Sequence, residues 1–471
     1  MNAMDLPHKS ASGFLSEYFP STNEMQAIDA RHHVHPFSDM RGINAKGSRI
    51  IVRSEGCYLW DSDGNRIIDG MSGLWCVNVG HGRIELAVAA FDQMKRLSFY
   101  NTFFGTTHPP IVRLSQMLAE IMPKNIEKFF FVNSGSEANE TAMRIALRYW
   151  QAQGKPSKQI FIARMNGYHG STVAAASLGG MSYMHDQIPC RLSNVVHVGQ
   201  PYWYGEGGDM SPDEFGIVRA REIEQAILQA GADNVAAVVG EPFQGAGGVI
   251  FPPKTYWPEV QRICRKYDVL ICADEVIGGF GRTGRWFSSE LFDLEPDIVT
   301  FAKGLTSGYI PMGGTGITSR VAKVLTDSGE FHHGMTYSGH PVAAAVAIAN
   351  IEIIRRDGLV ERVSSDIGPF FQALLRDALA DCPIVGEVSG EGLVAGIQLV
   401  QDKKNRTRFS DGDSVTLRCN EICFANNLVM RDGGDRMLLA PPLTVTRFEI
   451  EEIVSKARRS LDQTAIERGL A

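Results

Sequence analysis

Short apolar runs that alternate with segments of helical periodicity are the clearest pattern in this chain. Two of them, VLICADEV from Val269 and DIVTFAKG from Asp297, are β-branched and apolar almost throughout. Such runs are typical of strands buried on both faces of a parallel sheet. Similar runs begin at Lys128, Gln159 and Val235. We therefore predict an α/β fold in which a mainly parallel sheet is flanked by helices.

The pattern also divides the chain into three parts. Residues 1–75 contain a predicted short helix at 24–32 and the hairpin YLWDSDGNRIID, which has an Asp-Gly turn. Residues 76–345 alternate strands with helices and form the predicted large domain. In residues 346–471 we expect the end of a helix that begins at Pro341, a helical stretch through Cys423 and an amphipathic helix from about Phe448.

Composition agrees with a multidomain globular protein. The chain has 471 residues, of which 44% are hydrophobic and 21% charged. A net charge of −7 without a basic stripe argues against nucleic-acid binding. The sequence shows no targeting signal and no apolar run of membrane-spanning length, so we predict a cytoplasmic protein. Its eight cysteines form no CxxC pair, and we expect reduced, buried thiols.

Candidate chemistry lies at the ends of the first two runs, where Asp274 and Lys303 stand. Ligands of open α/β sheets bind outside the carboxyl ends of the strands. A desolvated lysine there loses its proton more easily and can form an imine, while a carboxylate can keep a pyridine nitrogen protonated. Pyridoxal phosphate requires both groups. The alternative for Lys303 alone is a solvated lysine in a loop.

Two further segments support a phosphorylated, flat cofactor. Ser134, Gly135 and Ser136 open a predicted helix, where small residues and free N–H groups make a phosphate cradle. Ser136 could equally be the N-cap of that helix, and the two roles are compatible. Tyr168 follows a predicted strand and has glycines nearby, which let its ring approach a planar ligand. Glu241 ends another strand, either near the pocket or as a capping group.

Some suggestive motifs are better explained without a ligand. Gly279, Gly281 and Gly284 spell GxGxxG, but no helix is predicted after them. The histidines at 32, 33 and 35 and at 332 and 333 have metal-ligand spacing. The sequence shows no cysteine or carboxylate partner that would complete a site, so we predict no metal.

The motifs SGSEAN, GYHGST, EPFQGAGGV, ADEVIGGFGRTG, FAKG and TYSGHP, in this order, resemble the class III (ω-amino) aminotransferases of fold type I. HHVHPF, GLWCVNVGHGR and LVMRDGGDRMLLAPPL are similar to the bacterial amine:pyruvate transaminases, including those that act on putrescine. The resemblance spans nearly the whole chain. It implies a large cofactor domain and a smaller α+β domain, to which residues 1–75 contribute together with an active-site wall.

The resemblance also implies roles for single residues. Lys303 would tether pyridoxal phosphate and carry out the 1,3-proton transfer, and Asp274 would pair with the pyridine nitrogen. Val276 would pack under the ring and Tyr168 over it. The implied cofactor-binding set is Ser134, Gly135, Ser136, Tyr168, His169, Glu241, Asp274, Val276 and Lys303, with Thr336 of the partner subunit. A site completed in this way requires a homodimer.

For the substrate, the resemblance implies walls formed by Phe37, Trp75 and Tyr168 and a carboxylate-binding Arg431. Arg431 by itself could equally form a surface ion pair in a glycine-rich turn. The chain departs from the family pattern at Met335, which could alter pocket size, and at Ser389.

Together these observations predict a pyridoxal-phosphate transaminase that moves an amino group from a primary amine, diamine or ω-amino acid to pyruvate. The products would be an aldehyde or ketone and alanine. The alternatives are a decarboxylase or aminomutase of the same fold, or a cofactor-binding regulator without turnover. The sequence leaves the amine donor and the choice between dimer and tetramer open.

Overall fold

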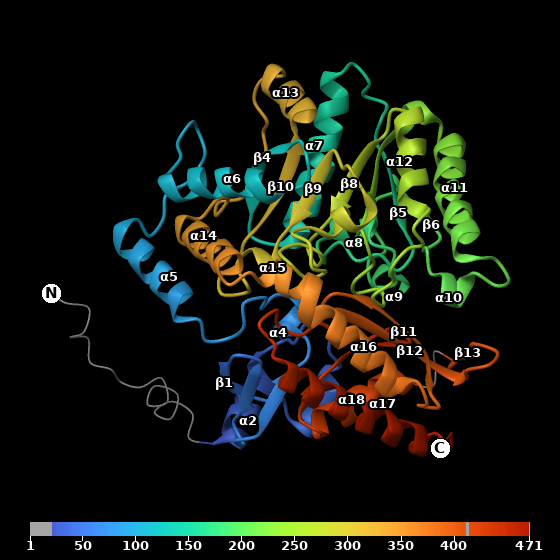
Figure 1. The fold of residues 1–471 in the computed structure, drawn as a ribbon. Coiled ribbons are helices and arrows are strands. Elements are labelled where there is room, and N and C mark those ends of the chain that lie inside the picture. The colour runs from blue at the N-terminus through green and yellow to red at the C-terminus, as the bar shows by residue number, and fades with distance from the viewer. Residues whose placement is uncertain (1–20, 411–413, 471) are drawn as a thin grey trace.

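The computed structural model describes residues 21–410 and 414–470. The opening segment, in which no targeting signal was predicted, lies outside these ranges. The centre of the fold is a seven-stranded sheet (Figure 1). Its strands, in spatial order, are β4 (Ile126–Val132), β10 (Gly313–Thr318), β9 (Ile298–Phe301), β8 (Leu270–Asp274), β7 (Val235–Gly240), β5 (Ile160–Arg164) and β6 (Val195–Val198).

The mainly parallel sheet predicted from the apolar runs is confirmed. β5 pairs in parallel with β6 and β7, and β8 lies in parallel between β7 and β9. β10 is antiparallel to both of its neighbours, β4 and β9. Asp274 on β8 is in register with Thr300 on β9. This register brings the carboxyl ends of the two strands, and the residues that follow them, to one place.

Helices cover both faces of this sheet. α7 (Gly135–Ala152) packs with α8 (Val173–Leu178) and α13 (Ser319–Asp327) against one face, where the core includes Phe161, Ala237 and Leu270. α11 (Pro212–Ala230) and α12 (Tyr256–Lys266) cover the other face over Ile162, Val238 and Ile271. Alternate residues of β5 therefore serve opposite cores, as the two-residue period of a strand requires. The helices up to this point are α2 (Thr22–His32), α3 (Met40–Lys46), α4 (Ser72–Trp75), α5 (Ile84–Arg96), α6 (Pro109–Ile121), α7 (Gly135–Ala152), α8 (Val173–Leu178), α9 (Ser182–His185), α10 (Trp203–Glu206), α11 (Pro212–Ala230), α12 (Tyr256–Lys266) and α13 (Ser319–Asp327).

A smaller part of the molecule unites the two ends of the chain. In Figure 1 the blue N-terminal strands lie beside the orange and red C-terminal elements. β14 (Leu428–Val429) extends the N-terminal sheet by pairing in parallel with β3 (Arg66–Asp69). The strands of this part are β1 (Ile51–Glu55), β2 (Tyr58–Asp61), β3 (Arg66–Asp69), β11 (Val385–Glu391), β12 (Val394–Asp402), β13 (Thr407–Arg408), β14 (Leu428–Val429), β15 (Arg431–Gly433) and β16 (Arg436–Leu439). Its helices are α14 (Pro341–Arg356), α15 (Leu359–Arg362), α16 (Gly368–Leu379), α17 (Val415–Ala425) and α18 (Arg447–Glu467).

Local sequence explains where several helices begin. Ser211 caps α11, with Pro212 at its first position and Glu214 closing a capping box. Thr446 and Glu449 form the same box at α18. The predicted helices at 24–32, from Pro341, through Cys423 and from about Phe448 are confirmed, as is the 58–69 hairpin.

The division at residue 345 remains a proposal, and it falls inside the continuous helix α14. Six cysteines are buried as expected, whereas Cys76 is half-buried. Cys190 is exposed, so the expectation of burial is wrong there, because it lies in a surface loop after α9. Within the described ranges, none of the helices combines the length and apolar character that a membrane span needs.

Candidate active site

A cavity of about 970 Å³ opens between the large sheet and the smaller part of the molecule. It lies at the carboxyl ends of β8 and β9, where the sequence predicted a ligand. The structure brings nearly every predicted site residue to its walls. These residues are Phe37, Trp75, Ser134, Gly135, Ser136, Tyr168, His169, Glu241, Asp274, Val276, Lys303 and Arg431.

Lys303 lies in a short 3₁₀ turn directly after β9 and has a left-handed φ of 42°. A non-glycine residue with this φ is strained unless its surroundings hold it there. Burial lowers the pKa of the Lys303 ammonium, and the nearby Asp274 opposes this only in part. A larger fraction of Lys303 is therefore in the neutral form, which is the nucleophilic one, than in an ordinary lysine at the same pH.

Asp274 is held by a hydrogen-bonded network. Nδ1 of His169 lies 2.7 Å from its Oδ2, Nδ2 of Asn139 donates to the same oxygen at 2.8 Å, and the Val276 N–H donates to Oδ1 at 3.0 Å. Burial alone would raise the pKa of Asp274, but these bonds outweigh it and lower the pKa below its ordinary value. The carboxylate is therefore ionised in a buried place, which suits a protonated ring nitrogen.

The amino end of α7 faces the same cavity. Ser134 is the N-cap, because its backbone is extended and its side chain accepts a hydrogen bond from the Glu137 N–H. The prediction that Ser136 could be the cap is wrong, since Ser136 lies inside the first turn and accepts from the Ser171 N–H at 3.1 Å. The first N–H groups of a helix have no intrahelical partner. No other group in the described ranges accepts a hydrogen bond from the Gly135 or Ser136 N–H, so both can bind an anion.

Close backbone approach shapes this corner. A Cβ on Gly135 would lie 2.9 Å from Val276 Cγ1, so a larger residue would displace the side chain that lines the cavity floor. At Gly170, with φ of 133°, a Cβ would lie 2.4 Å from Ser136 Oγ. The absence of a side chain at both glycines therefore allows the start of α7 to pack closely against Val276 and against the loop that carries Tyr168.

Glu241 holds the loop that carries Tyr168 in place through hydrogen bonds. Its carboxylate accepts hydrogen bonds from the Tyr168 N–H at 3.2 Å and the Gly245 N–H at 2.7 Å. Burial raises its pKa. The two roles left open for Glu241 thus coexist, because it lines the cavity and also binds loop N–H groups.

Aromatic side chains line the outer wall. Trp75 is 2% exposed and has a left-handed φ of 68°. Its indole N–H is buried without a hydrogen-bond partner in the described part of the chain. Phe37 is 62% exposed and lies edge-on to Tyr168, with ring centroids 6.4 Å apart. The wall offers apolar surface and one unused donor to a ligand.

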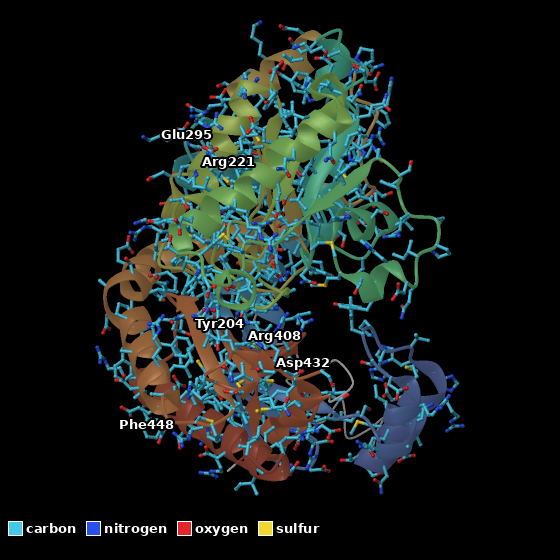
Figure 2. The ribbon with its side chains drawn as sticks, turned by 90° about the vertical axis from the view of Figure 1, so that its right-hand side faces the viewer. Tyr204, Arg221, Glu295, Arg408, Asp432 and Phe448 are labelled. Carbon is cyan, nitrogen blue, oxygen red and sulfur yellow. The ribbon has the colours of Figure 1, made fainter. Side chains whose placement is uncertain are left out.

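Arg431 is the first residue of β15 and belongs to the smaller part of the molecule. Figure 2 labels Asp432, the next residue in the chain, and Arg408 of β13, which lie where the smaller part faces the large domain. No hydrogen bond or ion pair within residues 21–410 and 414–470 holds the Arg431 guanidinium, so the alternative of a surface ion pair finds no support in the described chain. The neighbouring Arg408 is paired with Asp435 at 3.2 Å. Arg431 is thus a cation available to a bound carboxylate.

Two of the cavity residues that sequence reasoning missed, Asn139 and Arg436, contact residues that it had singled out. Asn139, one turn into α7, joins Asp274 to Thr300, whose Oγ1 donates to the Asn139 Oδ1 at 3.1 Å. Arg436 is 1% exposed and pairs with Glu387 at 3.1 Å. Arg436 also donates to Ser389, so the departure at Ser389 adjoins the cavity wall. Asn139 follows Gly135 by four residues and so lies on the same face of the helix, which could have predicted from the sequence that its side chain faces the cavity.

The remaining predicted residues, which are Thr336, Met335 and the two groups of histidines, lie away from these walls. Thr336 is exposed and does not line the cavity of its own chain, and Met335 beside it is half-buried. His333 binds Thr141 and stacks on Phe130. At the other histidine cluster, the expectation that no carboxylate is present is wrong, because Asp29 contacts both His33 and His35. The helical turn between Asp29 and His33 produces this contact.

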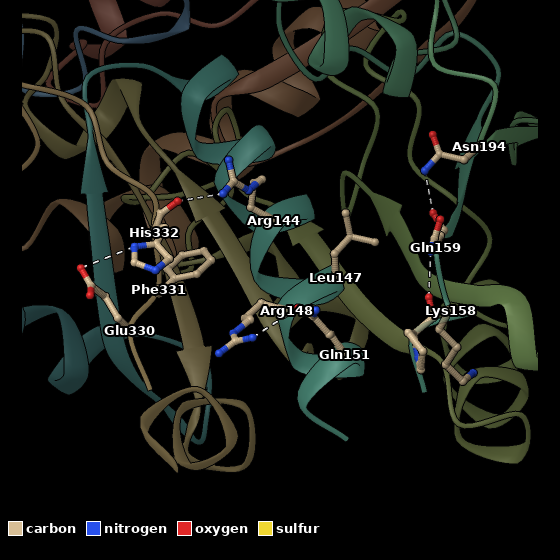
Figure 3. A pocket seen from close by; sticks show the side chains of 11 residues that line it. Arg144, Leu147, Arg148, Gln151, Lys158, Gln159, Asn194, Glu330, Phe331 and His332 are labelled. Atoms are coloured by element: carbon tan, nitrogen blue, oxygen red, sulfur yellow. Dashed lines mark hydrogen bonds and ion pairs between the residues drawn. The ribbon is translucent and has the colours of Figure 1, made fainter. Parts of the chain in front are cut away.

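A second cavity of about 660 Å³ lies at the opposite end of the sheet (Figure 3). It is bordered by the second half of α7, with Arg144 and Arg148, and by His332 and Asn194. Arg144 and Arg148 donate to backbone carbonyls of His332 and Ser328. It lies at the amino ends of the parallel strands and lacks the lysine and aspartate pair, so the cofactor chemistry belongs to the first cavity.

The first cavity fits pyridoxal phosphate on its own geometry. An amine with a lowered pKa, an ionised buried carboxylate and a helix start with free N–H groups converge there. With this sheet order, they define a pyridoxal-phosphate-dependent transferase of fold type I.

Comparison with known proteins narrows the class further. The family model for aminotransferase class III matches residues 43–461. A putrescine–pyruvate aminotransferase of Pseudomonas aeruginosa is 53% identical over 94% of this chain and 97% of its own length. A diaminobutyrate–2-oxoglutarate transaminase of Halomonas elongata is 39% identical, over 88% and 90%. The ω-transaminase of Pseudomonas jessenii in complex with PMP aligns with a TM-score of 0.92 at 39% identity, over 95% and 99% of the chains.

The chain belongs to the class III aminotransferases. It is an enzyme, and its cofactor is pyridoxal phosphate. The resemblance predicted from the sequence motifs is confirmed.

Proposed function

We propose that this enzyme transfers an amino group from a primary amine, diamine or ω-amino acid to pyruvate, giving an aldehyde or ketone and alanine. The observation that carries the proposal is the free Arg431 guanidinium beside Lys303 in an aromatic-walled cavity. A carboxylate next to the reacting carbon of pyruvate would bind Arg431 in a bidentate manner. The similarity to a putrescine–pyruvate aminotransferase supports a diamine as the donor.

We assign the proton transfer to Lys303. Its amine lies in the cavity, and its lowered pKa makes the neutral form, which can accept a proton from the substrate carbon, more available than in an ordinary lysine. The bound cofactor supplies an electron-withdrawing ring that stabilises the negative charge left on that carbon. Lys303 would then return the proton to the other carbon that is bound to the transferred nitrogen, which completes the 1,3-proton transfer.

The remaining residues position the cofactor. Asp274 would hold the ring nitrogen protonated, and His169 and Asn139 keep the carboxylate fixed and ionised. Val276 and Tyr168 would enclose the ring from its two faces. Ser134, Gly135 and Ser136 would bind the phosphate at the start of α7, and Glu241 would support the loop of Tyr168. Phe37 and Trp75 would bound the substrate space and exclude water.

We further propose a cytoplasmic homodimer in which Thr336 of the partner subunit completes the phosphate site. Thr336 is exposed in a segment that also exposes Tyr337, and the Tyr337 ring packs edge-on against Phe99 at 5.6 Å. Phe104 in the adjacent loop is 93% exposed. Exposed aromatic side chains that gather on one surface are typical of a protein interface.

The test is a screen of amine donors against pyruvate with alanine as the readout. Putrescine and other aliphatic amines should give alanine, while omission of the amine should give none. Each substrate alone should also convert the cofactor spectrum between its aldehyde and amine forms. A spectrum that no amine changes would support a regulator, and release of carbon dioxide from an amino acid donor would support a decarboxylase.

A further inference from the structure

A carboxylate and two imidazoles meet outside the catalytic cavity, at the end of α2. Asp29 lies in the last turn of this helix, and His33 follows it by one turn. The chain then becomes extended at His33, which turns His35 back toward Asp29. His33 Nδ1 lies 3.0 Å from Asp29 Oδ1, and His35 Nε2 lies 2.8 Å from Asp29 Oδ2.

The three side chains present their donor atoms to one small volume. One atom from each residue lies within 4.8 Å of the other two, and the centroids of the two imidazole rings are 4.2 Å apart. In a tetrahedral zinc site with bonds of about 2.0–2.1 Å, ligand atoms lie roughly 3.3 Å from one another. Small side-chain rotations therefore suffice to place an ion between these atoms. Within the described residues, this is the one group of three such side chains that comes so close.

From this geometry, we propose that Asp29, His33 and His35 bind a divalent transition-metal ion, for which Zn²⁺ is the natural probe. Two imidazole nitrogens and one carboxylate oxygen suit zinc and its neighbours in the first transition row, whereas Mg²⁺ and Ca²⁺ prefer oxygen ligands alone. This reverses the expectation from the sequence, in which no carboxylate was assigned to these histidines. The three protein ligands leave a fourth position for water.

The exposure of the three side chains suits an ion that enters from solvent. The Asp29 and His35 side chains are 16% and 19% exposed and form the inner side, while His33, at 58%, leaves a path for an ion from solvent.

The position of the cluster connects it to the catalytic cavity. Pro36 and Phe37 follow His35 directly, and both line the cavity. Phe37 also has a left-handed φ of 48°, so its placement depends on the segment that precedes it. A metal bound by His33 and His35 would fix this segment and thereby the wall that Phe37 forms.

The experiment is a Zn²⁺ titration of the tag-free holoenzyme, stripped with a chelator, in a Cys190→Ser background that removes the exposed thiol. Calorimetry should show one Zn²⁺ bound per chain. His33→Gln, His35→Gln and Asp29→Asn should each weaken this binding at least tenfold. His32→Gln is the matched control, because His32 is an exposed neighbour that does not contact Asp29, and it should bind as the parent does. Co²⁺ should give the absorption bands of a low-symmetry site in the parent and lose them in the variants.

Two results would overturn the proposal. One is a parent that binds no Zn²⁺ in the micromolar range, and the other is a titration that is the same in His33→Gln, His35→Gln and the parent. Thermal unfolding of the metal-free proteins checks that the variants are folded. Hydrogen exchange then tests the location, since Zn²⁺ should protect amides 33–37 in the parent and not in His35→Gln. None of these readouts depends on the amine donor or on turnover.

Discussion

The carboxylate of Asp274 and Nδ1 of His169 lie 2.7 Å apart, and both side chains are almost completely buried. Because an ionised carboxylate can only accept, His169 must carry its proton on Nδ1. This bond is the first among those that lower the pKa of Asp274, although burial opposes them. The state of Asp274 therefore depends on a side chain that does not itself need to touch the substrate.

The first prediction tests this dependence with His169→Gln. A hydrogen bond to a charged group contributes about 1.5–3 kcal/mol, so turnover should fall roughly 10- to 100-fold. The cofactor should stay bound through its phosphate, with an absorption band whose pH dependence shifts. Asp274→Asn should lose more activity than His169→Gln, because it removes the charge itself. Equal, near-native rates in both variants would remove the pair from the mechanism.

The second prediction concerns Lys303→Ala, which should abolish alanine formation and leave the fold intact. The substitution removes the amine that tethers the cofactor and moves the proton. Borohydride should no longer fix the cofactor to the protein. The control is Lys323→Ala on α13, an exposed lysine paired with Asp327, which should keep full activity. Alanine production by Lys303→Ala would show that the assignment is wrong.

The third prediction concerns pH. Burial lowers the pKa of Lys303 below the ordinary 10.5, so the neutral amine is present at lower pH than in a free lysine. The rate at which apoenzyme captures pyridoxal phosphate should rise with pH and reach half its maximum below pH 10.5. Rapid mixing over a pH series, with borohydride trapping, measures this midpoint. A midpoint at the ordinary lysine value would mean that the amine is solvated.

The fourth prediction separates the two half-reactions through Arg431→Ala. Pyruvate and alanine carry a carboxylate beside the reacting carbon, whereas an aliphatic amine or diamine carries none there. The variant should therefore lose most of the pyruvate half-reaction, by roughly 10- to 100-fold for a charge-assisted hydrogen-bonded contact, and keep the amine half-reaction. Single-substrate kinetics of the two cofactor forms measures each half.

Arg221→Ala, on the exposed surface of α11 (Figure 2), is the control for Arg431→Ala. It removes an arginine far from the cavity and should change neither half-reaction. An equal loss of both half-reactions in Arg431→Ala would show a structural role for this residue.

The fifth prediction follows from the proposed shared phosphate site. Dilution that separates the subunits should release cofactor and activity together, and sedimentation should show monomers over the same concentration range. Thr336→Ala should weaken cofactor retention by roughly tenfold or more, since it removes a hydrogen bond to a charged group. Thr326→Ala, whose hydroxyl binds the Ala322 carbonyl within α13, should leave retention unchanged. A fully active monomer would contradict the proposal.

The sequence by itself determined the local elements and the positions of the main chemical groups. The apolar runs that end at Asp274 and before Lys303 predicted buried parallel strands, and the structure has β8 and β9 there. Such features are readable because strand period, helix caps and turn residues act over a few neighbouring positions. Since parallel strands share one carboxyl edge, the convergence of Asp274 and Lys303 followed from the same pattern.

Only the tertiary structure decided what lies beside these elements. It inserted β10 antiparallel between β4 and β9, and it placed Arg436 beside Ser389 at the cavity wall. It also connected Asn139 to Asp274 across 135 positions of sequence. At the end of α2 it turned His35 back toward Asp29, so that Asp29, His33 and His35 form one cluster. Local periodicity carries no information about such contacts, because they depend on how helices and strands pack and on which side chains the packing brings within hydrogen-bonding distance.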